Sequence, residues 1–86
     1  MSQGGRKGGA MQELDLSDLK CPLPVLHTQK ALANMAEGSR LHVLATDPMA
    51  AIDIPHFCTQ KGHRLIEASQ CGDRLSFILE KGSGQD

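Results

Sequence analysis

Aromatic side chains, an excess of charge and long apolar runs are all scarce or missing in this sequence. The 86 residues include no Trp and no Tyr, and the two phenylalanines are Phe57 and Phe77. Lys and Arg number 9 against 10 Asp and Glu, which gives a net charge of -1. A chain without a basic surface or stacking platforms does not fit direct nucleic-acid binding. A chain without a run of about 18 apolar residues does not fit a membrane-spanning protein.

Paired cysteines are also missing. The three cysteines, Cys21, Cys58 and Cys71, form no C-x-x-C pair, so a zinc knuckle or a thioredoxin-type site has little support. The first ten residues are Gly-rich and contain no apolar core of a secretory signal. An odd number of cysteines in such a chain indicates reduced thiols and a cytoplasmic location. The four histidines have no metal-ligand spacing, so we expect no metal, and any thiol chemistry must use a single thiol.

The length allows one small domain with a modest core. Residues 1–12, which begin with a stretch of four glycines and two basic residues, are expected to be a disordered leader, with Met11 as an alternative natural start. The folded domain is expected over residues 13–81, and residues 82–86 are expected to form a flexible C-terminal tail.

Along the sequence, the spacing of apolar residues changes between the period typical of strands and the period typical of helices. We expect a short strand and turn over 13–19, strands over 41–46, 63–69 and 75–80, helices over 24–36 and 48–61, and a tight turn over 70–73. The order β-α-β-α-β-β predicts an α+β fold. It is a two-layer α/β sandwich, with two helices on one face of a four-stranded mixed sheet.

Prolines, glycines and aspartates mark the ends of the predicted helices. Gly38 is expected to stop the first helix, and Gly62 the second. Asp47 is expected to cap the second helix, which Pro55 must kink or restart, with Asp53 as a possible second cap. Both aspartates are therefore interpreted as caps rather than catalytic carboxylates.

A Cys-Pro-Leu-Pro element lies where the first strand meets the first helix. Pro22 and Pro24 restrict the residues that precede them, which holds Cys21 at the mouth of the helix. A helix N-terminus can lower the pKa of a thiol, with Lys20 helping and Asp18 opposing. Cys21 is therefore a candidate single-thiol nucleophile. The alternative is an unusual helix start with a passive cysteine.

These residues resemble the TusA/SirA-like sulfur-carrier family. The likeness rests on the Cys-Pro-Leu-Pro-Val segment 21–25, Lys30 in the following helix, the Asp-Pro step at 47–48 and the Asp-Ile-Pro-His-Phe-Cys segment 53–58. It extends over about residues 14–81, the element order included. The resemblance implies a two-layer sandwich similar to the C-terminal domain of a bacterial translation initiation factor.

The resemblance also implies a function. A cysteine desulfurase or another donor would place sulfane sulfur on Cys21 as a persulfide, and a downstream sulfur-relay protein would accept it. Relatives serve tRNA 2-thiouridine synthesis, sulfur oxidation or molybdenum-cofactor supply. Lys30 would be a possible contact for the partner. No metal or organic cofactor, no direct nucleic acid and no membrane is expected, and the chain is expected to be a monomeric carrier with sulfurtransferase character.

The other thiols and other functions remain as alternatives. Cys58 is expected to be buried and inert, and Cys71 exposed in a turn. A nucleic-acid-binding module rests on the likeness of fold alone. A regulatory protein-interaction module would use the Cys-Pro-Leu-Pro turn only as a docking surface.

Overall fold

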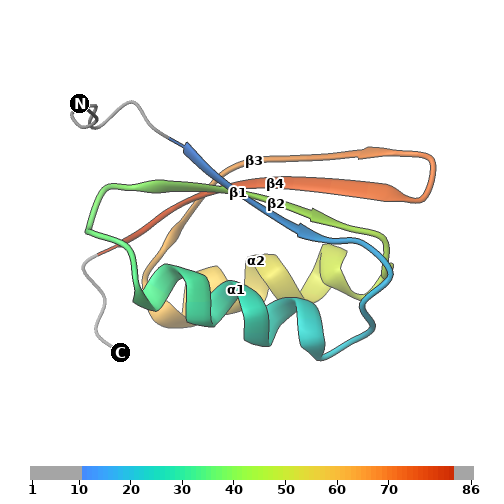
Figure 1. Ribbon diagram of the computed structural model, residues 1–86, viewed down its shortest axis with the longest axis horizontal. Helices are drawn as coiled ribbons and strands as arrows, with labels where there is room; N and C mark the ends of the chain where they lie inside the picture. Colours follow the sequence, from blue (N-terminus) through green and yellow to red (C-terminus); the bar gives the residue numbers. More distant parts are fainter. Residues whose placement is uncertain (1–10, 83–86) are drawn as a thin grey trace.

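The computed structural model describes residues 11–82 and contains four strands and two helices in that range (Figure 1). In chain order these are β1 (Met11–Leu16), α1 (Leu23–Ala33), β2 (Arg40–Ala45), α2 (Ala50–Lys61), β3 (Arg64–Cys71) and β4 (Arg74–Glu80). The order β-α-β-α-β-β is the predicted one. None of the helices in this part of the chain is long and apolar enough to cross a membrane.

The strands form one mixed sheet in the order β1-β2-β4-β3. β1 and β2 run parallel, whereas β4 runs antiparallel to both of its neighbours. Both helices lie on the same face of the sheet, which makes two layers (Figure 1). The predicted α+β sandwich is therefore confirmed.

The core lies between the sheet and the helices, as the alternation of the strand residues predicts. Every second residue of β2 and β4 is buried, starting at Leu41 and Leu75 respectively. The helices contribute the most buried side chains of their inner faces, among them Leu32, Ile54 and Phe57. β3, at the edge of the sheet, is exposed along its whole length. The core is therefore built on β1, β2 and β4.

Several element boundaries differ from those predicted. β1 begins at Met11, so residues 11 and 12 pair with β2 instead of belonging to the leader. α1 ends at Ala33, before Gly38, because the N–H of Asn34 already closes its last turn. Gly38 lies in the connection to β2 with a φ of 90°. The rest of the predicted leader, and residues 83–86 of the predicted tail, lie outside the described residues.

The hairpin turn after β3 is shorter than predicted. Cys71 is the last residue of β3 and pairs with Arg74, which leaves Gly72 and Asp73 as the two turn residues. Gly72 has a φ of 64°, the left-handed conformation that a two-residue hairpin requires.

α2 is one continuous helix with Pro55 inside it, so of the two predicted alternatives, a kink or a restart, the restart is wrong. The helix proper begins at Ala50, after a turn in which the Ala50 N–H donates to the carbonyl of Asp47. Asp53 lies in the first turn of this helix and not at a second N-terminus. Gly62 ends the helix in the left-handed conformation, as predicted.

The lysine that follows β4 donates hydrogen bonds to carbonyls at the C-terminal end of α1. The Lys81 ammonium donates to the carbonyls of Leu32 at 2.7 Å and Met35 at 3.2 Å. A cation at a helix C-terminus donates hydrogen bonds to unpaired carbonyls and interacts favourably with the negative end of the helix dipole. This contact fastens α1 to the segment that follows β4.

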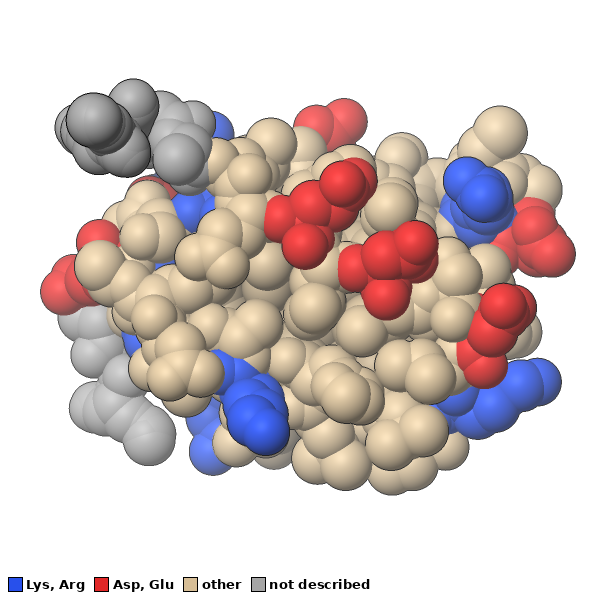
Figure 2. All heavy atoms as spheres, in the orientation of Figure 1, with Lys and Arg blue, Asp and Glu red and all other residues tan. Residues whose placement is uncertain are grey.

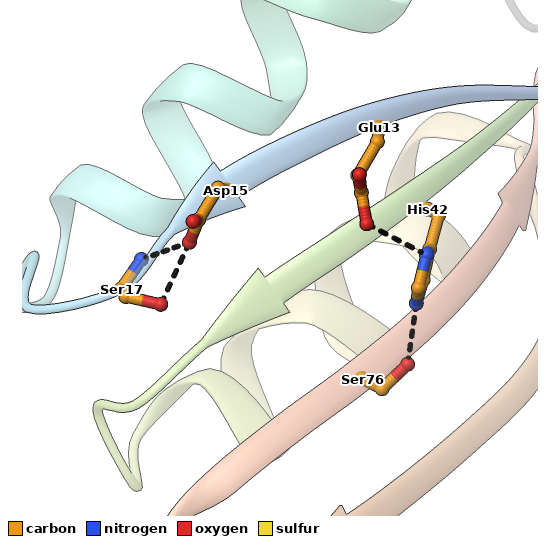
Figure 3. Close-up of polar contacts among 5 residues, drawn as sticks. All are labelled: Glu13, Asp15, Ser17, His42 and Ser76. Carbon is orange, nitrogen blue, oxygen red and sulfur yellow. Dashed lines mark hydrogen bonds and ion pairs between the residues drawn. The ribbon is translucent and has the colours of Figure 1, made fainter.

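The open face of the sheet carries a cross-strand polar chain (Figure 3). His42 Nε2 lies 2.7 Å from Ser76 Oγ, and its Nδ1 lies 3.5 Å from a carboxylate oxygen of Glu13. The three residues come from three neighbouring strands. Cross-strand pairs of this kind stabilise a sheet, and these three side chains lie on the face opposite to the helices.

Candidate functional site

The parallel pairing of β1 and β2 determines where the predicted nucleophile lies. The carboxyl ends of parallel strands meet at the same edge of a sheet, so the connections that follow β1 and β2 are neighbours. The first connection contains Cys21 and leads into α1, and the second contains Asp47 and leads into α2. Two helix N-termini and two strand ends therefore surround one thiol.

The turn after β1 is fixed by short polar contacts. Ser17 donates from its backbone N–H at 3.0 Å and from its hydroxyl at 2.7 Å to the Asp15 carboxylate (Figure 3). These bonds lower the pKa of Asp15 below its ordinary value, the side-chain bond most. Asp18 has a φ of 72°, and its N–H donates at 2.8 Å to the hydroxyl of Thr46. The two connections are thus joined before the chain reaches Cys21.

The prolines place Cys21 just outside the helix. Pro22 is the N-cap of α1, and Pro24 occupies the second helical position. The N–H of Leu23 donates at 2.7 Å to the carbonyl of Lys20, which closes the turn around the cysteine. Cys21 is exposed, as the sequence predicted for a nucleophile.

Two carboxylates contact Cys21 from the second connection and from α2. Its backbone N–H donates to Asp47 Oδ2, and its thiol donates to Asp53 Oδ2 at 3.1 Å. The other oxygen of Asp47 accepts from the N–H of Met49 at 3.3 Å, as in a capping turn. The N-cap of α2 is Met49, so the prediction that Asp47 caps this helix is wrong; Asp47 instead lies one turn earlier and contacts the thiol segment. Asp53 does not act as the predicted cap, because its carboxylate reaches Cys21.

The acidic surroundings reverse the predicted electrostatics of the thiol. The hydrogen bond to Asp53 raises the pKa of Cys21, and the charges of Asp53 and Asp47 add to this effect. The helix N-terminus offers little to oppose them, because Pro22 and Pro24 have no N–H and the N–H of Leu23 is already bonded. The expectation of a lowered pKa is therefore wrong for the free chain.

The remaining residues singled out from the sequence lie away from this thiol. Lys30 is exposed in the last turn of α1, about 10 Å along the helix axis from Leu23 at a rise of 1.5 Å per residue. Cys58 is buried in α2, as predicted, and burial raises the pKa of its thiol to about 11. Cys71 is exposed, three strands away from β1 across the sheet, or about 14 Å.

Exposed apolar side chains lie at the starts of both helices. Leu23 and Leu26 belong to the first turns of α1, and Met49 and Ile52 lie at the start of α2. Their exposed fractions range from 42% for Leu23 to 63% for Ile52. Large apolar side chains exposed near a functional group are available for contact with a partner protein.

The charges visible on one face of the molecule do not gather by sign. Figure 2 shows acidic side chains across the middle of this face and also at its left and right ends, where basic side chains lie near them, with uncharged surface between. In residues 11–82, no three His, Cys, Asp or Glu side chains come together as a metal ion would require. The chemistry of the site is therefore argued from one thiol and two carboxylates.

Asp53 is the residue of this site that sequence reasoning missed. It is separated from Cys21 by 32 positions, and the neighbouring Pro55 favoured its interpretation as a cap. The usable signal was the periodicity of α2. With Ala50, Ile54 and Phe57 facing the core, Asp53 comes to the edge of the buried face near the helix N-terminus.

Comparisons with known proteins show the family to which this chain belongs. Residues 12–81 match the model of a family described as sulfurtransferase TusA. A sulfur carrier protein TusA from Allochromatium vinosum is 44% identical over 70 residues, which cover 81% of this chain and 92% of that protein. A putative sulfur carrier protein from Neisseria meningitidis serogroup A is 52% identical over 69 residues, covering 80% of this chain and 93% of that protein.

A solved structure supports the fold independently. The SirA-like protein from Desulfitobacterium hafniense superposes with a TM-score of 0.73 at 21% identity, covering 86% of this chain and all of that one. The chain belongs to the TusA sulfurtransferase family. The family resemblance read from the Cys-Pro-Leu-Pro element is thereby confirmed.

Proposed function

We propose that this chain carries sulfane sulfur as a persulfide on Cys21. Membership of the TusA family makes the chain a sulfur carrier, and Cys21 is the thiol that combines exposure with the Cys-Pro-Leu-Pro position. The observation that supports it most is the placement of this exposed thiol at the junction of both helix N-termini. Pro22 and Pro24 are its positioning residues, because they keep the sulfur outside the helix.

The transfer is an exchange at sulfur. The Cys21 thiolate attacks the terminal sulfur of a donor persulfide, the donor sulfur–sulfur bond breaks, and the donor cysteine leaves as a thiolate. The proton given up by Cys21 neutralises that leaving thiolate. In the second half, an acceptor thiolate attacks the terminal sulfur of the Cys21 persulfide and releases Cys21. No net oxidation occurs in either half, so no redox cofactor is needed.

The donor and the acceptor are proteins in this proposal. A cysteine desulfurase supplies the sulfur, and a relay protein with its own cysteine receives it. The exposed apolar residues Leu23, Leu26, Met49 and Ile52 suit a protein surface that covers Cys21 during transfer. Lys30 would contact the partner at the far end of α1. Tests of tRNA 2-thiouridine synthesis, sulfur oxidation and molybdenum-cofactor supply would each identify a different final acceptor.

Intact-mass spectrometry tests the assignment of Cys21. The chain is incubated with a cysteine desulfurase and L-cysteine without reductant, beside the Cys21→Ser variant and a Cys71→Ser control. We expect the mass of one sulfur atom to appear on the native chain and on the control, and to vanish with dithiothreitol. The Cys21→Ser variant should keep its fold and gain nothing.

Two results would overturn the proposal. Sulfur that still loads on the Cys21→Ser variant would move the site to Cys58 or Cys71. No loading of the native chain by several desulfurases, with partner binding unaffected by Cys21→Ser, would favour a docking module.

A further inference from the structure

The carboxylate of Asp53 faces the sulfur atom itself and not the backbone around it. Its Oδ2 lies 3.1 Å from Cys21 Sγ, within the distance of a hydrogen bond donated by the thiol. Asp47 meets the same cysteine at its backbone N–H. Two carboxylates from outside the Cys-Pro-Leu-Pro element therefore surround one nucleophile.

The position of Asp53 is fixed by the packing of α2. Its neighbour Ile54 is fully buried, and Ala50, one turn earlier, is 2% exposed. The N–H of Asp53 donates at 2.8 Å to the carbonyl of Met49, so the residue belongs to the regular helix. Its side chain is partly buried at the edge of the core. The contact with the thiol is thus held by the tertiary fold.

We propose that Asp53 is a positioning residue that keeps Cys21 as a protonated thiol in the free carrier, so that sulfur uptake depends on a partner that neutralises this carboxylate. The inference rests on the proposed function of Cys21. It adds a residue and a condition: the partner must bring a cationic side chain to Asp53.

The charges around the sulfur give the direction of the effect. Asp53 on α2 and Asp47 before α2 both oppose the thiolate, and Asp53 has the larger effect because it accepts the thiol proton. Asp18 and Lys20 are the charged neighbours along the chain, and they are exposed. A thiol kept protonated is a poor nucleophile toward oxidants and unrelated electrophiles. When a cation of the partner pairs with Asp53, the hydrogen bond is lost, and the thiolate forms at the moment of transfer.

Alkylation of Cys21 measures this effect without any sulfur donor. The rate of reaction with iodoacetamide is followed between pH 6 and about 10, spanning the usual range of thiol ionisation, by mass spectrometry of the Cys21 peptide. Asp53→Asn keeps the shape of the side chain and removes its charge. Asp73→Asn removes the same charge from the hairpin turn between β3 and β4 and serves as the matched control.

The expected result is a faster reaction of the Asp53→Asn variant near neutral pH. A tenfold gain in thiolate is partly offset by about threefold lower nucleophilicity of the less basic sulfur, which leaves about a threefold gain in rate. The pH midpoint of the rate should fall with Asp53→Asn, stay near the native value with Asp53→Glu, and not move with Asp73→Asn. Thermal melting confirms that each variant is folded.

A native-like pH midpoint in Asp53→Asn would overturn the proposal, and so would a rate that falls at every pH, which would make Asp53 an activating base. These outcomes are separate from the test of sulfur loading, because alkylation reports the thiol whether or not a persulfide forms. If the midpoint shifts while the native chain never takes up sulfur, the role of Asp53 stands and the carrier assignment fails.

Discussion

At the scale of single residues, the fold gives three identical side chains different reactivities. Cys21 is exposed and hydrogen-bonded to a carboxylate, Cys71 is exposed at the end of β3, and Cys58 is buried on the inner face of α2. Thiol chemistry follows access and the fraction of thiolate. The environment of each sulfur, and not its place in the sequence, therefore sets its use.

Cys58 should be the last thiol to react in the folded chain. Because burial raises the pKa of its thiol to about 11, its thiolate is scarce at neutral pH. We expect its alkylation at pH 8 to be slower than that of Cys21 and Cys71 by on the order of a hundredfold, and to catch up in denaturant. Peptide mass spectrometry after timed labelling checks this order. Rapid labelling of Cys58 without denaturant would show that α2 is not packed as described.

At the scale of secondary-structure elements, α1 contains a polar group that the core does not satisfy. Thr28 is fully buried, and its hydroxyl has no hydrogen-bond partner. A buried hydroxyl without a partner costs free energy of folding, because it has lost its bond to water. Valine has the same shape and a similar helix propensity, without the hydroxyl.

Thr28→Val should therefore stabilise the domain. We expect the free energy of unfolding to rise by about 1 kcal/mol, which raises Tm by about 4–8 °C in a domain of this size. Thr59→Val, at an exposed position of α2, is the matched control and should change the stability by less than about 0.5 kcal/mol. Calorimetry measures both. A lower Tm for Thr28→Val would show that the hydroxyl bonds within the helix, for example to the carbonyl of Pro24.

The elements were predictable to different degrees. Leu75, Phe77 and Leu79 alternate so cleanly that β4 could be placed from the sequence, and Gly62 marked the end of α2. The end of α1 was missed, because Gly38 is a stronger signal for a helix end than Asn34, which the helix actually uses. Such choices depend on which backbone groups tertiary structure has already satisfied.

Only the part of the site that depends on neighbouring residues could be predicted from the sequence. Proline geometry placed Cys21 at the helix mouth, since that effect acts between neighbours. Asp53 is 32 positions away, and its contact depends on how α2 packs beside α1. The periodicity of α2 places Asp53 at the edge of the buried face, but it does not show which residue of another element lies opposite. The predicted direction of the pKa shift of Cys21 was wrong for that reason.

At the scale of the whole molecule, the charge balance bears on the nucleic-acid alternative. The net charge is -1, and the face in Figure 2 alternates acidic, uncharged and basic surface. Binding to phosphates requires several Lys or Arg side chains on one surface and weakens steeply with salt.

We therefore expect negligible retention of RNA by the purified chain at low ionic strength. Filter binding of labelled tRNA, with a strongly basic protein of similar size as the positive control, measures it. Retention that is strong in low salt and lost at about 200 mM salt would contradict the expectation and revive a direct nucleic-acid role.

The site joins two stretches of chain that meet only when β1 and β2 lie parallel and α2 is in place. The ionisation of the Cys21 thiol therefore reports whether this tertiary packing is intact. If α2 lifts away, Cys21 loses its carboxylate partner and regains the ionisation of a free cysteine. In a partly opened molecule the Cys21 thiol would then react more readily with unrelated electrophiles than in the native one. Loss of tertiary structure would therefore also reduce the selectivity of the thiol.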